Sequence, residues 1–389
     1  MFMKRLYRYL FSALLSFFFT ACITPFIPNH ADTQGGALVI EGDIILDGYT
    51  KVYLSESRAL DSSDPIRYIT NAQVMVQSDE GEEYNGTVVY NADAPPFFLI
   101  DTRALPYNRK YSLCVTLEGS FLRFISEPQT PLITPEIGSI DFVINEASTE
   151  VDVMITSHGE HNSSPFYKWS YLEDWEIVAQ YRTNVVFDLS TNQLLLYPDT
   201  YPLLYCWDHS ESASIMVGRT DHLQSNRIYQ QLNTIDYRSN KISYLYYTEV
   251  QQMSISEEAY TYWINLRKNN DEIGGIFAPQ PSEMYGNIRL VSSLESNIRA
   301  LGYISVGTVD TKSVFVSEAE LGIYKPPFFC RSYNPDDYME FDVIPQPFEA
   351  GFLPVGWSLD EIEWVSSICV DCRRQGNKNK PSFWPNDHW

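Results

Sequence analysis

Short runs in which apolar and polar residues alternate recur along the first third of this chain, and they limit the folds that it can adopt. Residues 38–46, 72–77 and 109–117 are such runs, and Gly, Asn and Asp residues stand between them. A period of two residues is typical of a β-strand with one buried face. Strands at a spacing of roughly ten residues predict a small β-sandwich, immunoglobulin-like or transthyretin-like, over residues 37–135.

The remainder of the chain, residues 136–389, is predicted to form a larger β-rich domain. A cluster of three prolines between residues 128 and 135 separates it from the first domain. Further strand-like runs follow, among them residues 139–144, 151–155 and 242–250. The apolar content of 44% provides both domains with enough material for packed cores. The expected fold class is therefore mainly β, in two domains.

One prominent helix is predicted within this β-rich domain, at about residues 254–270. Ser254 and Glu257 match a capping box, in which a serine caps the first turn and a glutamate three residues later returns a hydrogen bond. Apolar side chains then form one face at helical spacing, namely Ala259, Tyr262, Trp263 and Leu266. We expect this face to pack against a sheet.

The charge balance excludes some classes of partner. The chain has 50 acidic and 27 basic residues, which gives a formal net charge of −23. This surplus argues against binding to nucleic acid and against docking on anionic lipid headgroups through a basic patch. The acidic residues are scattered along the sequence, which favours a soluble, mutually repelling surface over a specific site for a cation.

The N-terminus has the features of a secretory signal. Three basic residues precede an apolar run at residues 10–19, and two small residues then stand directly before Cys22. An apolar run of about ten residues is too short to span a membrane. We predict a lipoprotein signal peptide at residues 1–21, lipidation of Cys22, and a flexible tether at residues 22–36. The alternative is an ordinary signal peptide followed by an incidental cysteine.

The other five cysteines are an odd number, so at least one has no partner within the chain. Cys114 lies in an alternating run and is predicted to be a buried, inert strand cysteine. Outside the cytoplasm the remaining four can oxidise to disulfides. Structural zinc is the alternative, because two of them stand two residues apart and another precedes His209 at the same spacing. These four candidates for disulfides or zinc are Cys206, Cys330, Cys369 and Cys372.

The sequence contains none of the common catalytic signatures. It has no G-x-S-x-G elbow, no glycine-rich phosphate loop and no H-E-x-x-H motif. His158, Glu160 and His161 lie beside a polar Asn-Ser-Ser stretch that is typical of a solvated loop. The acidic stretch at residues 334–342 lacks the ordered spacing of a calcium loop and is interpreted as an acidic turn. We therefore predict no catalytic residue, no metal and no cofactor.

Several segments resemble one family. These are residues 38–42, 167–169, 256–263, 274–277 and 369–373. With them the chain resembles the Bacteroidota lipoprotein family known as domain of unknown function 4249 (DUF4249), over nearly all of its length after the signal. One departure lies after Gly376, where the family pattern would have a second glycine.

The resemblance implies a role but no reaction centre. Members look like outer-membrane or surface lipoproteins, often encoded beside TonB-dependent receptors, and they have no assigned activity. The expectation is a non-catalytic binding or accessory lipoprotein of the outer membrane, held by its acyl anchor and partnering a TonB-dependent β-barrel receptor in nutrient uptake. One alternative is a metal-dependent surface hydrolase, which would need His158, Glu160 and His161, or Cys206 and His209, to converge. Another is a purely structural envelope protein.

Overall fold

The structure is a computed structural model in which the protein is mainly β, as the alternating pattern predicted. The predicted signal peptide, Cys22 and the tether lie outside the described residues. Among the residues described, no helix is both long and apolar enough to cross a membrane. The structure describes residues 37–58, 63–92, 94–119, 122–145, 147–160, 163–183, 185–188, 193–196, 201–236, 238–271, 286–291, 300–323, 330, 352–357 and 362–386.

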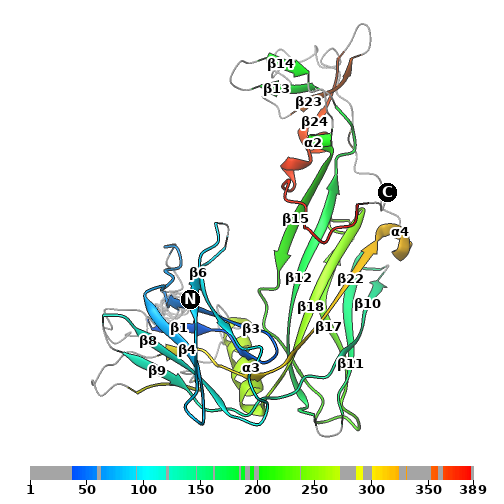
Figure 1. The fold of residues 1–389 in the computed structure, drawn as a ribbon. Helices are drawn as coiled ribbons and strands as arrows, with labels where there is room; N and C mark the ends of the chain where they lie inside the picture. Colours follow the sequence, from blue (N-terminus) through cyan, green and yellow to red (C-terminus); the bar gives the residue numbers. More distant parts are fainter. Residues whose placement is uncertain are drawn as a thin grey trace, which may run out of the picture.

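Two five-stranded sheets contain the N-terminal strands (Figure 1). The first has the order β20-β1-β3-β7-β6, with β1 (Leu38–Glu41), β3 (Tyr49–Glu56), β6 (Thr87–Val89), β7 (Phe97–Asp101) and β20 (Ala300–Leu301). The second has the order β19-β9-β8-β4-β5, with β4 (Ala72–Ser78), β5 (Glu83–Asn85), β8 (Tyr111–Leu117), β9 (Arg123–Ser126) and β19 (Ile288–Leu290).

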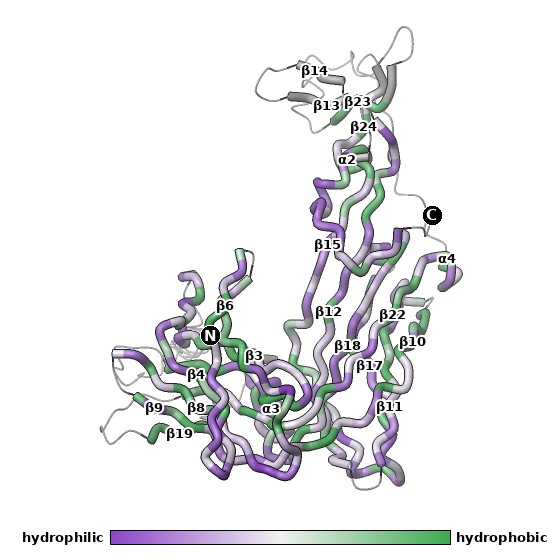
Figure 2. Tube along the Cα trace, in the orientation of Figure 1, coloured by the Kyte–Doolittle hydropathy of each residue, from purple (hydrophilic) through white to green (hydrophobic). Residues whose placement is uncertain are grey.

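Both of these sheets bury apolar side chains in one shared core. Ile40 and Val52 come from the first sheet, and Val76 and Val115 from the second. Burial of each such side chain contributes about 1.5–3 kcal/mol. Figure 2 shows hydrophobic stretches along β8 and β19 of the second sheet. The immunoglobulin-like or transthyretin-like topology remains a prediction.

Residues 286–307 return to these N-terminal sheets from far along the sequence. β19 pairs antiparallel with β9, and β20 pairs parallel with β1. A short strand, β2 (Ile44–Ile45), likewise pairs in parallel with β21 (Val306–Gly307). Ile304 and Val306 lie in the same core as the N-terminal strands. The first body of the protein thus includes strands that lie well beyond residue 135.

Two further sheets pack face to face to form a second, taller body (Figure 1). One has the order β15-β12-β18-β22, with β16 also on β12; its strands are β12 (Phe166–Val178), β15 (Tyr205–Glu211), β16 (Met216–Arg219), β18 (Leu245–Ile255) and β22 (Val309–Ser317). The other has the order β10-β11-β17, with β10 (Ile137–Asn145), β11 (Glu150–His158) and β17 (Arg227–Asp236).

A buried ionic group lies in the core between these sheets. The Glu173 side chain is 2% exposed, and its carboxylate accepts hydrogen bonds from Lys241 at 2.6 Å, Tyr246 at 2.7 Å and Asn233 at 2.8 Å. The Lys241 ammonium also lies over the ring of Trp175, 4.6 Å from its centroid. The charge of Glu173 is therefore fully compensated within the core.

Small elements complete the fold. Two hairpins are formed by β13 (Val185–Asp188) with β14 (Gln193–Leu196) and by β23 (Phe352–Trp357) with β24 (Ile362–Ser366). The helical segments are α2 (Tyr201–Leu204), α3 (Glu257–Asp271), α4 (Glu318–Leu321), η3 (Ser367–Cys369) and η4 (Cys372–Arg374).

The prominent helix α3 begins later than the capping box predicted. Ser254 belongs to β18, where neighbouring Ile255 pairs with Phe166. The N-terminal cap is Ser256, whose Oγ accepts a hydrogen bond from the amide of Ala259 at 3.2 Å. The assignment of Ser254 as the cap was therefore wrong, because sheet pairing holds the chain extended through residue 255.

Two disulfides join the four cysteines for which the sequence allowed either disulfide bonds or a structural zinc site. Cys206 bonds to Cys372, and Cys330 bonds to Cys369. A bridged sulfur is not a thiolate, so these residues form staples rather than a zinc site. Cys114 is buried and is the free cysteine among those described. The Cys206–Cys372 bond ties the C-terminal segment to β15.

Candidate functional site

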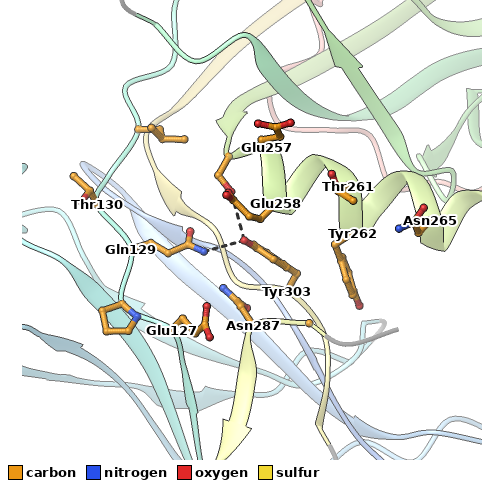
Figure 3. Close-up of a pocket in the computed structure, with 14 residues that line it drawn as sticks. Glu127, Gln129, Thr130, Glu257, Glu258, Thr261, Tyr262, Asn265, Asn287 and Tyr303 are labelled. Atoms are coloured by element: carbon orange, nitrogen blue, oxygen red, sulfur yellow. Dashed lines mark hydrogen bonds between the residues drawn. The ribbon is translucent and has the colours of Figure 1, made fainter. Parts of the chain in front are cut away.

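A cavity of about 900 Å³ opens where helix α3 meets the segment that leads out of β9 (Figure 3). Residues 127–132 form one wall, and residues 256–265 of α3 form the opposite wall. Gly286, Asn287 and Tyr303 close the base between them. The cavity therefore lies at the junction of the two bodies of the protein.

The helical wall is fixed by packing beneath it. Ala259 is fully buried, and it shares a small apolar core with Phe166 of β12 and Val217 of β16. Ser256, directly after the end of β18, caps the first turn of the helix. The opposite side of that turn carries Glu257 and Glu258, which are exposed at the cavity.

The base of the cavity depends on two glycines that allow very close backbone contact. A Cβ added to Gly286 would lie 1.6 Å from the carbonyl oxygen of Gly302. Gly302 itself has a φ of +133°, and a Cβ there would lie 2.1 Å from the carbonyl oxygen of Ile40. No other residue type fits at either position. Three segments, around residues 40, 286 and 302, are thus stacked backbone against backbone.

This stacking places two buried side chains at the base. Asn287 is 6% exposed; its amide donates to the carbonyl oxygen of Ile304 at 2.8 Å and accepts from the Ile304 amide at 2.9 Å. Tyr303 is 8% exposed, and its hydroxyl accepts from Gln129 Nε2 at 3.2 Å. The same hydroxyl lies 3.4 Å from Ser256 Oγ. Tyr303 therefore bridges the two walls, as Figure 3 shows.

Aromatic rings line the cavity next to Tyr303. Its ring centroid is 5.4 Å from that of Tyr262, which in turn lies edge-on to Trp263 at 5.2 Å. Burial raises the pKa of the Tyr262 hydroxyl, so this phenol is neutral at physiological pH. Behind the helix wall the Lys168 ammonium lies 4.9 Å from the Trp263 ring centroid and forms an ion pair with Asp43.

Among the described residues, the histidines considered for metal binding do not line this cavity. His158 ends β11, where it pairs with Arg227, and His161 lies outside the described residues. His209 Nδ1 is 3.0 Å from Asp174 Oδ1, and its Nε2 is 3.6 Å from Glu211. Within the described ranges no group of three or more His, Cys, Asp or Glu residues could hold a metal ion. The hydrolase hypothesis also loses Cys206 as a thiolate ligand.

Sequence reasoning missed this cavity because its walls come from four separate segments. None of the lining residues forms a local motif with a known chemistry. The pairs Gly286-Asn287 and Gly302-Tyr303 were the available signal, because a glycine stands directly before a polar or aromatic residue in both segments that form the base.

Comparison with protein families places the chain beside one whose function is not assigned. A family model with the description "Domain of unknown function (DUF4249)" matches residues 23–313. No curated protein matches the chain.

Proposed function

We propose that this chain, which belongs to the DUF4249 family, is a lipid-anchored protein of the cell envelope that binds a ligand and partners a TonB-dependent outer-membrane receptor. In this role it catalyses no reaction. It holds a small molecule in the cavity beside α3 and assists the receptor in nutrient uptake.

The observation that carries the envelope location is the pair of disulfides. Such bonds persist in oxidising compartments and are rare in the cytosol. The sequence supports the same location independently, because residues 1–21 have the organisation of a secretory signal and Cys22 follows it directly. Several acyl chains on that cysteine would retain the protein at the membrane.

The binding role is supported by the cavity. Its volume lies within the range of small-molecule sites, roughly 300–1,000 Å³, and its base is rigid. The receptor partnership is supported by the resemblance to lipoproteins that are encoded beside such receptors.

The test is a pull-down of the tagged protein from native membranes in a mild detergent. We expect a TonB-dependent barrel to co-purify in near-equal amount with the wild type and not with Cys22→Ala, which lacks the acylated residue. Cys114→Ala is the matched control, because it removes a cysteine that carries no lipid, and it should behave as the wild type does. Recovery of the intact lipidated protein without a barrel would overturn the partnership.

A further inference from the structure

We propose that the cavity beside α3 binds a small organic cation, a molecule that carries ammonium or guanidinium groups. This inference names the ligand class for the binding role proposed above and rests on that role. The cavity and its aromatic base define the site, and the charge of its walls then selects among ligand classes.

The base of the cavity is formed by buried side chains that hydrogen bonds hold in place. Tyr303 and Asn287 are buried at its base, and each is fixed by hydrogen bonds to a separate segment of the chain. Because these two side chains are held before any ligand arrives, they lose little conformational entropy on binding.

The walls carry one sign of charge. Glu127, Glu257 and Glu258 line the cavity, and no Lys or Arg is among the described residues that do so. The N-terminus of α3 lies here too, and its dipole is equivalent to roughly half a positive charge. Set against three carboxylates, that dipole leaves a net charge of roughly −2.5. Anionic ligands are repelled, and cations are attracted.

The acidic residues are scattered in the sequence, but the fold gathers these three. Glu127 follows β9, whereas Glu257 and Glu258 open α3, 130 and 131 residues later in the numbering. Glutamates in a first helical turn are expected from the helix dipole alone. Glu127 belongs to a different element, so the dipole does not explain its position at the same cavity.

The two side-chain amides at the base of the cavity are already engaged within the protein. The Asn287 amide is engaged at both its nitrogen and its oxygen by the backbone of Ile304. Gln129 directs its amide nitrogen to the Tyr303 hydroxyl. The charged groups that remain for a ligand are the three glutamate carboxylates, which accept hydrogen bonds from N–H donors.

The rings of Tyr262 and Tyr303 add a surface that suits a cation. An ammonium or guanidinium group over such a ring gains about 0.5–2 kcal/mol, depending on desolvation. The same helix already holds one cation in this way, since the Lys168 ammonium lies over Trp263 and pairs with Asp43. A ligand ammonium between Tyr262 and Glu258 would repeat that combination of ring and carboxylate.

The experiment is isothermal titration calorimetry of the full lipidated protein in a non-ionic detergent. Spermidine is the cationic probe, maltose the neutral probe and citrate the anionic probe. We expect spermidine alone to bind, and its affinity to fall as the ionic strength rises. Binding of maltose or citrate instead, or of no probe, would overturn the proposal.

Variants distinguish binding at the cavity from nonspecific attraction to the net negative charge of the protein. Glu127→Gln combined with Glu258→Gln should weaken spermidine binding about tenfold or more, and Tyr262→Ala should weaken it about tenfold. Glu118→Gln removes one charge from the exposed turn after β8 and should leave the affinity unchanged. Equal weakening by Glu118→Gln would show nonspecific attraction and refute the site. Unaltered thermal unfolding verifies that each variant is folded.

This titration contains no receptor, so its result is independent of the pull-down. Spermidine binding without a co-purifying barrel would retain the ligand class and remove the receptor partnership. A co-purifying barrel without spermidine binding would retain the partnership and remove the ligand class.

Discussion

Removal of the Cys206–Cys372 disulfide is the perturbation whose effect follows most directly from the structure. The bond joins residues 166 positions apart. In the chain-entropy relation, closure of a loop of this length destabilises the unfolded state by about 5 kcal/mol at 25 °C. The Cys330–Cys369 bond spans 39 positions, for which the same relation gives about 4 kcal/mol.

The variant Cys206→Ala with Cys372→Ala should therefore lose about 5 kcal/mol of unfolding free energy. Both cysteines are fully buried beside β15, so the lost sulfur contacts add to the entropic effect. Because domains are commonly stable by only about 5–15 kcal/mol, a loss of this size should shift the transition strongly.

The assay is urea unfolding followed by tryptophan fluorescence, with linear extrapolation to water. Two matched variants give the scale: the double alanine variant at Cys330 and Cys369 should lose somewhat less, and Cys114→Ala should leave both bridges intact. A loss below about 1 kcal/mol for the Cys206 and Cys372 variant would refute the loop-closure reasoning.

Four further variants test other side chains. Ser256→Ala should lower stability by about 1 kcal/mol because it removes the cap of α3. Ser254→Ala should be near neutral, because its buried hydroxyl has no hydrogen-bond partner among the described residues; equal losses in urea unfolding would contradict this assignment. Lys241→Ala should cost about 3–5 kcal/mol in the same assay, since Glu173 would remain buried without its cation, and an unchanged midpoint would show that the pair contributes little. Burial raises the pKa of Asp174, so this group favours the folded state below about pH 4, and that contribution is lost as the pH rises through its raised pKa. The unfolding free energy of Asp174→Asn should therefore increase relative to the wild type from about pH 4 to neutrality, and parallel pH curves would refute this.

Sequence patterning predicted strands well where one face is buried and the pairing is regular. The run at residues 72–77 coincides with β4. The alternating pattern did not predict β17, whose buried residues are Ile228, Leu232 and Ile235. Their spacing of four and then three resembles a helix, because the pairing with β11 shifts register at Leu232 and inserts one extra residue. A bulge depends on the partner strand, so one segment alone does not reveal it.

The start of α3 shows the same limit at a helix terminus. Ser254 and Glu257 satisfy the local capping rule, but strand pairing extends β18 through Ile255 and moves the cap to Ser256. Local sequence preference predicted that a helix forms here, and the pairing of β18 determined where the helix begins. The cavity was beyond prediction for a related reason, since its residues are brought together only by the return of residues 286–307 to the N-terminal sheets.

The pairing of residues 286–307 with the N-terminal sheets also determines when the first sheets can finish folding. The amide of Ser305 donates to Asp43, 262 residues earlier, and β1 and β2 take their parallel partners from β20 and β21. A chain that leaves a secretion channel N-terminus first would expose the unpaired edges of β1 and β2 until residue 307 has emerged. Such edges invite pairing with other chains, and contacts this distant form slowly. Under the envelope location proposed above, the exported protein should thus depend on periplasmic chaperones, and products truncated before residue 307 should be degraded.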